Sequence, residues 1–250
     1  VLVLLTIYLL AGCASTNAPP ADPLERLNRA TFKFNDVVDN AILIPVAKSY
    51  QAVTPQFVRS GVSNTFGNIS DVSTSLNNLL QGKPADAASD FGRVIVNSTL
   101  GILGLFDVAS SMGLEKHNED FGQTLGKWGV GSGPYLVIPL MGPSTLRDSG
   151  GRFVDGQLSY SKLIRHVPTR NETFGLDIIH IRAELLNASK TLDEASLDKY
   201  QFLRDAFLQR RLNLVHDGKV PQTARDKLEE DLEVPVSLAP SPAAKAVDKK

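Results

Sequence analysis

The side chains that could support catalysis are few and lie far apart in the sequence. His117 stands close to Glu119 and Asp120, and such a group could bind a metal ion or act as a general base. A solvent-exposed loop histidine explains it more simply. His180 and Glu184 lack the second histidine of a zinc peptidase site. We therefore expect neither a metal site nor acid–base catalysis.

The motifs for nucleotide binding and nucleophilic attack are also incomplete. Residues 129–133 contain glycines and a serine without the spacing of a nucleophile elbow. Residues 122–127 read Gly-x-x-x-Gly-Lys, which is one residue short of a phosphate-binding loop. We expect a protein that is not an enzyme and has no cofactor, and that binds or conducts a ligand without transforming it.

The one cysteine offers a different chemistry. Cys13 follows the triplet Leu-Ala-Gly at the end of an apolar run. A short hydrophobic stretch that ends in small residues is the core of a secretory signal, and Leu-Ala-Gly-Cys resembles the lipobox at which bacterial lipoproteins are acylated. We expect residues 1–12 to be a signal peptide, truncated at its front because a starting Met and a basic segment are missing, and Cys13 to carry the lipid. A buried N-terminal strand with a core cysteine is the alternative.

Composition divides the rest of the chain into three parts. Residues 13–22 form the predicted lipidated tether, residues 23–233 a helical domain, and residues 234–250 a disordered tail with too little apolar content to fold. Ala14 follows the cysteine where lipoproteins retained in the inner membrane have Asp, which favours the outer membrane. A net charge of −1 provides no basic field for nucleic acid. Membrane attachment must then come from acyl chains and apolar contacts.

Helical signals dominate the domain and predict an all-α fold. Asp22, Pro23 and Glu25 have the types of an N-cap, a first-turn proline and a capping-box acid. Further helices are predicted from residue 54, over 71–80, over 84–96 and over 171–189. The strongest amphipathic pattern covers residues 193–215. Three arginines are expected on its solvated face: Arg204, Arg210 and Arg211.

The middle of the chain is rich in glycine and breaks this pattern. Of the 19 glycines, 13 lie between Gly92 and Gly156. The apolar run at 135–141 is bracketed by Gly-Pro pairs and is too short to cross a bilayer as a helix. It is either a buried loop or hairpin of a soluble core, or a helix-breaking apolar element at membrane depth.

Polar side chains are interleaved with these apolar segments. If they lie in the membrane zone they must pair or face water, because burying them unpaired costs several kcal/mol. The structural alternative is that they cap and tie together broken helices, with Asp107 capping a short helix and Ser144 capping the helix that follows it. The set consists of Asn97, Asp107, Asp120, Gln123, Arg147 and Asp148.

Several segments in the right order resemble the MlaA (VacJ) lipoproteins of Gram-negative outer membranes. They are residues 28–35 (Asn-Arg-Ala-Thr-Phe-Lys-Phe-Asn), 77–83 (Asn-Asn-Leu-Leu-Gln-Gly-Lys), 93–99 (Arg-Val-Ile-Val-Asn-Ser-Thr), 119–126 (Glu-Asp-Phe-Gly-Gln-Thr-Leu-Gly) and 142–148 (Gly-Pro-Ser-Thr-Leu-Arg-Asp). The resemblance is dense from Cys13 to about Asp155 and thins through the C-terminal helices.

This resemblance implies a ring-like arrangement of amphipathic helices in one leaflet of the outer membrane, around a central amphipathic channel. It implies that the protein removes mislocalised phospholipids from the outer leaflet and passes them to a soluble periplasmic lipid-carrier protein, and that it associates with a porin trimer. Residues 94–155 would form much of the passage and its gating loop. The residues expected to line or gate it are Asn97, Asp107, Asp120, Gln123, Tyr135, Leu136, Ile138, Leu140, Arg147 and Asp148.

Two other functions compete with this one. A structural porin-associated outer-membrane lipoprotein would bind its partner without transporting lipid. A lipid hydrolase using His117 and Asp120 would need a nucleophile, and the nearby sequence offers no activated Ser or Cys. We also hypothesise that the 193–215 helix, through Arg210 and Arg211, contributes to docking of the carrier.

Overall fold

The protein is described from a computed structural model that covers residues 19–159, 162 and 164–233. Cys13, the signal peptide at 1–12, the first part of the tether and the tail at 234–250 lie outside these residues. Helices make up most of the described chain, so the all-α prediction is confirmed with one small exception, a two-stranded hairpin.

The N-terminal half consists of three helical segments that run end to end, followed by a helical hairpin and two short helices. α2 (Glu25–Val38) runs through a π-helical turn, η1 (Asp39–Leu43), into α3 (Ile44–Val53). α4 (Gln56–Leu80) and α5 (Pro84–Thr99) then form an antiparallel helical hairpin that has the most extensive contact between any two elements. The short helices α6 (Val108–Ser111) and α7 (Phe121–Lys127) follow.

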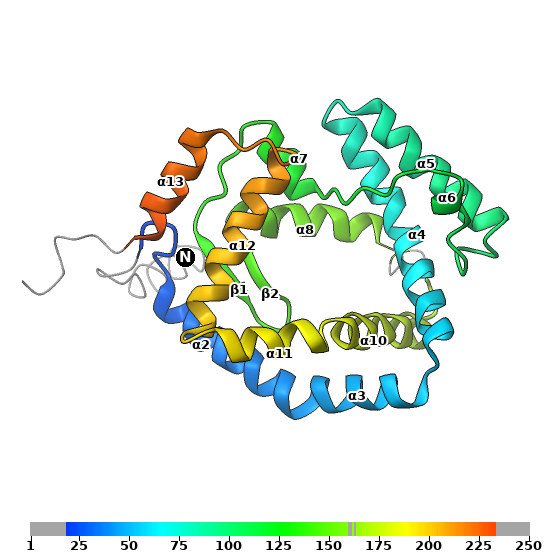
Figure 1. The fold of residues 1–250 in the computed structure, drawn as a ribbon, viewed down its shortest axis with the longest axis horizontal. Coiled ribbons are helices and arrows are strands. Elements are labelled where there is room, and N and C mark those ends of the chain that lie inside the picture. The colour runs from blue at the N-terminus through cyan, green and yellow to red at the C-terminus, as the bar shows by residue number, and fades with distance from the viewer. Residues whose placement is uncertain (1–18, 160–161, 163, 234–250) are drawn as a thin grey trace, which may run out of the picture.

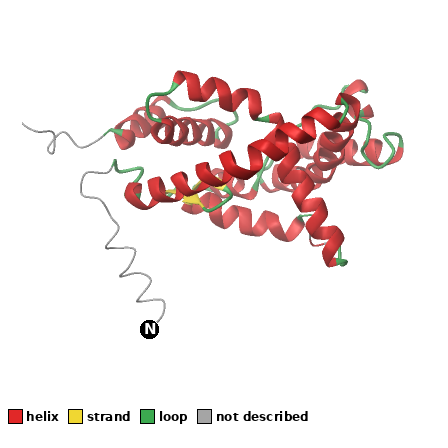
Figure 2. Ribbon diagram, turned by 90° about the horizontal axis from the view of Figure 1, so that it is seen from below, coloured by secondary structure: helices red, strands yellow, loops and turns green. Residues whose placement is uncertain are grey.

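The C-terminal half closes the fold. β1 (Tyr135–Ile138) pairs antiparallel with β2 (Gly142–Thr145), with Tyr135 opposite Thr145. The remaining helices are α8 (Leu146–Leu158), α10 (Val167–Glu184), α11 (Leu186–Ala195), α12 (Lys199–Val215) and α13 (Gln222–Leu232). In Figure 1, α4, α8, α10, α11 and α12 are arranged as a ring about a common centre, and α3 packs along the outer side of α10. Figure 2 shows this ring from its edge, with the hairpin among the helices.

Three predicted boundaries are wrong. The helices expected from residue 54 and over 71–80 are one continuous helix, α4, because nothing between them breaks it. The helix expected over 171–189 ends at Glu184 and is followed by α11. The helix expected over 193–215 begins at Lys199, where Asp198 accepts hydrogen bonds from two backbone N–H groups. Residues 135–141 belong to a hairpin, and whether this hairpin lies at membrane depth stays a prediction.

The distribution of polarity is inverted relative to a soluble protein. Among the described residues, the buried set holds 18 polar or charged side chains and only 8 hydrophobic ones, while 35 large hydrophobic side chains are exposed. The compact apolar core is small and consists of Tyr135, Val137, Tyr200 and Leu208. Between α4 and α5, the buried contacts are instead hydrogen bonds such as Asn78 to Asp90, with a length of 2.8 Å. Exposed apolar area of this extent is typical of a surface that contacts another protein or a lipid phase.

Candidate functional site

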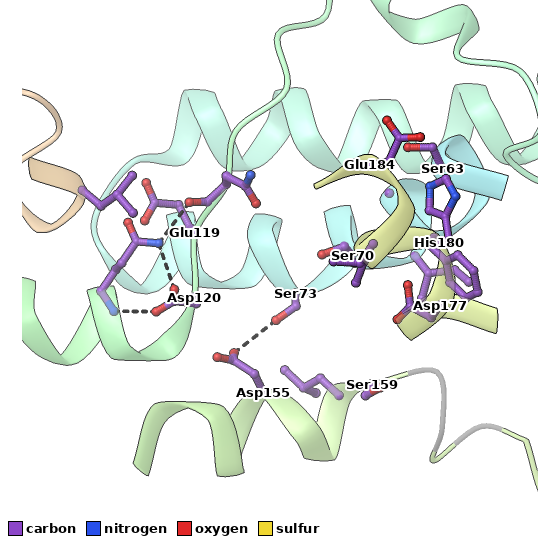
Figure 3. Close-up of a pocket in the computed structure, with 18 of the residues that line it drawn as sticks. Ser63, Ser70, Ser73, Glu119, Asp120, Asp155, Ser159, Asp177, His180 and Glu184 are labelled. Carbon is purple, nitrogen blue, oxygen red and sulfur yellow. Dashed lines mark hydrogen bonds between the residues drawn. The ribbon is translucent and has the colours of Figure 1, made fainter. Parts of the chain in front are cut away.

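A cavity with a volume of about 680 Å³ lies at the centre of the ring. Helices α4, α8, α10 and α12 and the segment that leads into α7 form its walls (Figure 3). The lining is amphipathic. Its apolar members are Phe66, Ile69, Leu158, Ile181, Leu185 and Leu214, and its polar members include Ser63, Ser70, Ser73, Asn118, Glu119, Asp120, Gln123, Asp155, Ser159, Asp177, His180, Glu184, Arg210 and Arg211.

Asp120 lies at the centre of an ionic network on one side of this cavity. Arg211 of α12 donates to Asp120 at 2.6 and 2.9 Å and to Asp148 of α8 at 2.8 Å. Arg147 lies 2.9 Å from the same Asp148 oxygen. Burial by itself would raise the pKa of Asp120, but the hydrogen bonds and charge of Arg211 outweigh it and hold this pKa below its ordinary value. The network therefore joins three helices that are far apart in sequence.

The same residues also serve as helix caps. Asp120 accepts the backbone N–H of Gln123 at 2.8 Å and so begins α7. Thr145, and not Ser144 as predicted, caps α8 by accepting the N–H of Asp148 at 3.1 Å. Ser144 is buried within β2 and its hydroxyl contacts Ser149. Of the predicted passage residues, Asp120 and Gln123 line the cavity, whereas Asp148 and Arg147 do not and are joined to Asp120 only through Arg211.

Asn97 and Asp107 lie in a separate cluster of polar side chains, where α5 contacts α6. Arg93, which is 1% exposed, donates to both Asp107 oxygens at 2.9 and 3.0 Å and to Asp71 at 3.2 Å. Asn97 donates to Asp107 at 3.1 Å. Asp107 also accepts the N–H of Ser110, which confirms its predicted role as a cap. Neither residue is part of the central lining, and their place in a lipid passage stays a prediction.

The predicted hairpin residues occupy different environments. Tyr135 is 1% exposed in the small apolar core, and burial raises its pKa above the usual range. Leu136 and Ile138 are half-buried, whereas Leu140 at the turn is exposed and has a φ of 62°. Asn35 of α2 holds the turn by donating to the Ile138 carbonyl at 3.0 Å and accepting the Leu140 N–H at 2.8 Å. Leu140 lines a second cavity of about 400 Å³ against α2 and η1.

The arginines of α12 are not where the sequence pattern puts them. Arg204 and Arg211 are 3% and 7% exposed, so the prediction of a solvated face is wrong for both. Arg204 donates to Asp205 at 2.7 Å and lies 3.6 Å from the buried Asp22. The acid partners of the two arginines offset the cost of burying the guanidinium groups, and most of these partners lie in other elements. Arg210 is exposed and lines the central cavity.

Several lining residues were missed by sequence reasoning. Ser70 and Ser73 are three residues apart on α4, and Asp177, His180 and Glu184 repeat at helical spacing on α10. This spacing puts each set on one face, which is the only signal that could have found them. His117, expected in solvent, is half-buried and lies 3.1 Å from Asp90, outside the central lining.

The described ranges contain no group of three or more His, Cys, Asp or Glu side chains placed to hold a metal ion. Nor does any helix there combine the length and apolar character required to cross a membrane.

With this geometry established, comparison with known proteins identifies the family. The family model described as MlaA lipoprotein matches residues 20–214. The chain belongs to the MlaA family. The match covers all the elements that build the central cavity, from α4 to α12.

Individual relatives agree with the family assignment. The chain is 36% identical over 219 residues to the intermembrane phospholipid transport system lipoprotein MlaA of Escherichia coli K12, covering 85% of this chain and 86% of that protein. It is 33% identical to the protein of that name from Haemophilus influenzae, covering 92% and 94% of the two chains. A solved structure reported as the structural basis for maintenance of bacterial outer membrane lipid asymmetry aligns with a TM-score of 0.69 and 35% identity, covering 78% of this chain and 98% of that one.

Proposed function

We propose that this chain is an outer-membrane lipoprotein that removes mislocalised phospholipids from the outer leaflet, and so maintains lipid asymmetry. Its relatives in the MlaA family are named for intermembrane phospholipid transport. The observation that carries the proposal is the combination of an apolar exterior with a polar, hollow interior. Phospholipid tails need apolar surroundings and the head group needs polar ones, and the central cavity offers both.

The exterior is suited to a lipid leaflet. Phe57 and Phe153 are 78% and 73% exposed, as large aromatic side chains seldom are in water. Moving such a side chain from water into an apolar medium contributes about 1.5–3 kcal/mol. Buried charged groups are paired within the protein, as Arg93 is with Asp71 and Asp107 between α4, α5 and α6.

A lipid anchor on Cys13 would hold this body at the membrane. Each buried CH₂ contributes about 0.8 kcal/mol, and one acyl chain alone anchors only marginally. Changing Cys13 to Ser removes the acylated sulfur, and we expect the variant to lose stable retention in the outer membrane. Membrane fractionation with immunodetection measures this, and a variant that stays in the outer membrane at the wild-type level would rule out acylation as the anchor.

The transport function is tested by deleting the gene and measuring phospholipid in the outer leaflet. The expected result is accumulation there, restored by the wild-type chain. Purified protein should also retain phospholipid that mass spectrometry detects. A deletion strain with unchanged outer-leaflet phospholipid would refute the proposal.

The proposal also includes two protein partners. We infer that a soluble periplasmic carrier receives the lipid and that a porin trimer holds the protein in place. Co-purification with each partner after crosslinking tests both. The alternative, a porin-associated lipoprotein without transport, predicts the porin contact and no bound phospholipid. Because Arg211 is buried, the hypothesis that it docks the carrier from the surface is not supported.

A further inference from the structure

The charge on the wall of the central cavity is uneven. Carboxylates outnumber the cationic side chains in the lining: Glu119, Asp120, Asp155, Asp177 and Glu184 stand against Arg210 and Arg211. A ligand that enters this cavity therefore meets an acidic surface. A cavity of about 680 Å³ falls within the range that binds small molecules or the polar part of a larger one.

Two of these acids are already neutralised by the protein. Asp120 is held by Arg211, and Glu119 lies 3.0 Å from the ammonium of Lys83. The remaining acids of the lining are Asp155 on α8 and Asp177 and Glu184 on α10.

Asp155 is held by neutral donors. It accepts the backbone N–H of Phe121 at 2.9 Å, the amide of Asn77 at 3.2 Å and the hydroxyl of Ser73 at 3.3 Å. Burial raises the pKa of Asp155 above its ordinary value, and these hydrogen bonds do not reverse the shift. A cation beside Asp155 would relieve this cost, because burying an anion is favourable only with a partner charge.

α10 presents a second acidic position across the cavity. Asp177, His180 and Glu184 line the cavity from this helix, and Figure 3 shows them grouped near Ser63 and Ser70, opposite Asp120. His180 is 4% exposed, with its ring nitrogen 3.5 Å from the hydroxyl of Tyr50. Glu184 is exposed and so can reach a ligand at little cost.

Gln123 adds an acceptor that the protein leaves unsatisfied. Its side chain is 2% exposed, and its amide nitrogen donates to the Asn118 carbonyl at 3.0 Å and to Asp120 at 3.2 Å. Its oxygen Oε1 has no hydrogen-bond partner among the described residues. A buried acceptor without a donor is costly, and a ligand that supplies an N–H group would satisfy it.

We propose that the central cavity selects phospholipids whose head group carries an ammonium, such as ethanolamine, over those with an anionic glycerol head group. The inference rests on the proposed function in lipid uptake and names its substrate class. The ammonium offers three N–H donors, as the ammonium of a lysine side chain does, and two acidic positions can accept them: Asp155 beside Ser73, and Glu184 on α10 across the cavity. The phosphate of the same head group pairs with Arg210, an exposed cation of the cavity lining. A glycerol head group brings the same phosphate without the cation, so its net negative charge is repelled by the acidic wall.

The test uses the full-length chain, purified from membranes in a non-ionic detergent. The purified protein is mixed with vesicles of equimolar phosphatidylethanolamine and phosphatidylglycerol that have identical acyl chains, then recovered. Total phosphorus gives the amount of lipid bound, and mass spectrometry gives the head-group ratio. We expect the wild-type protein to enrich the ethanolamine lipid at least threefold.

Two variants and a control locate the selectivity. Asp155→Asn keeps an acceptor oxygen for Phe121 and removes the charge, and Glu184→Gln removes a charge that lies at the exposed end of α10. We expect each to lower the enrichment and the double variant to abolish it. Glu172→Gln, on the same helix but outside the cavity lining, should keep the wild-type ratio.

The outcomes separate the two proposals. Lipid bound without head-group preference overturns the selectivity, and a preference unchanged in both the Asp155 and Glu184 variants overturns its assignment to this cavity; both results leave lipid uptake standing. The absence of bound phospholipid in the wild-type protein overturns both. Thermal unfolding of each variant checks that loss of preference is not loss of fold.

Discussion

Replacing Arg211 by Leu tests whether the ionic network around the cavity holds the ring together. Arg211 joins α12 to Asp120 at the start of α7 and to Asp148 in α8. The side chains of Arg211 and Asp148 are 9% and 5% exposed, so water cannot replace the lost partner. Removing one member of a buried ion pair costs about 3–5 kcal/mol.

Two features place the expected cost at the lower end of that range. Arg147 remains 2.9 Å from Asp148 after the change, and the side chain of Asp120 is 41% exposed and can be partly hydrated. We therefore expect a loss of about 3 kcal/mol in the free energy of unfolding. For a chain of this size, each kcal/mol lowers the melting temperature by about 2–4 °C, which gives a decrease of about 6–12 °C.

The assay is thermal unfolding of the detergent-solubilised chain, followed by circular dichroism. Arg210→Leu is the matched control because its side chain is exposed, and such substitutions usually change stability by less than about 0.5 kcal/mol. The reasoning is refuted if the Arg211 variant melts within 1 °C of the wild-type protein, or if the two variants lose equal stability.

The pH dependence of the Arg211 variant gives an independent check. The pKa of Asp120 lies below its unfolded value of 3.8, so its stabilising contribution is present above that value and is lost as the pH falls through the folded pKa. Without Arg211, burial dominates and raises the pKa of Asp120. The variant's deficit should therefore shrink as the pH is lowered from 7 toward about 5. A deficit that grows over this interval would contradict the assignment.

Two further predictions concern the close packing of α8 on α7 and the hydrogen bond that joins Tyr200 of α12 to Asp22. Gly151→Ala places a Cβ 2.7 Å from the Cα of Gly122, where α8 contacts α7, and should lower the free energy of unfolding by about 1–3 kcal/mol or more. As a control, Gly150→Ala meets nothing within 4 Å and should be neutral or stabilising. Similar losses of stability in the two variants, measured by thermal unfolding, would argue against the close contact. Tyr200→Phe removes the hydroxyl that donates to the fully buried Asp22 and should cost about 1.5–3 kcal/mol at pH 7. Because burial already raises the pKa of Asp22 and the variant raises it further, the loss should diminish at lower pH, and a constant loss would contradict this.

The sequence by itself determined the local structure and the family. Apolar spacing and capping residues predict most of the helices, because such signals depend only on near neighbours. The Gly-Pro brackets around residues 135–141 leave a hairpin among the open alternatives, and the motifs from 28–35 to 142–148 identify the family. The predicted N-cap at Asp107 also depends only on residues near it in the sequence, and it is confirmed.

Tertiary structure alone decided which side of each helix is buried. The pattern of α12 suggests a solvated row of arginines, yet Arg211 is buried against Asp120 and Asp148. The local pattern could not predict this, because these acids lie 91 and 63 residues away along the chain. The lining of the cavity has the same origin, since Ser73 and Asp155 meet only when α4 and α8 come together. Periodicity assumes that apolar faces turn inward, and that rule reverses in a protein whose exterior is apolar and whose interior is paired charge.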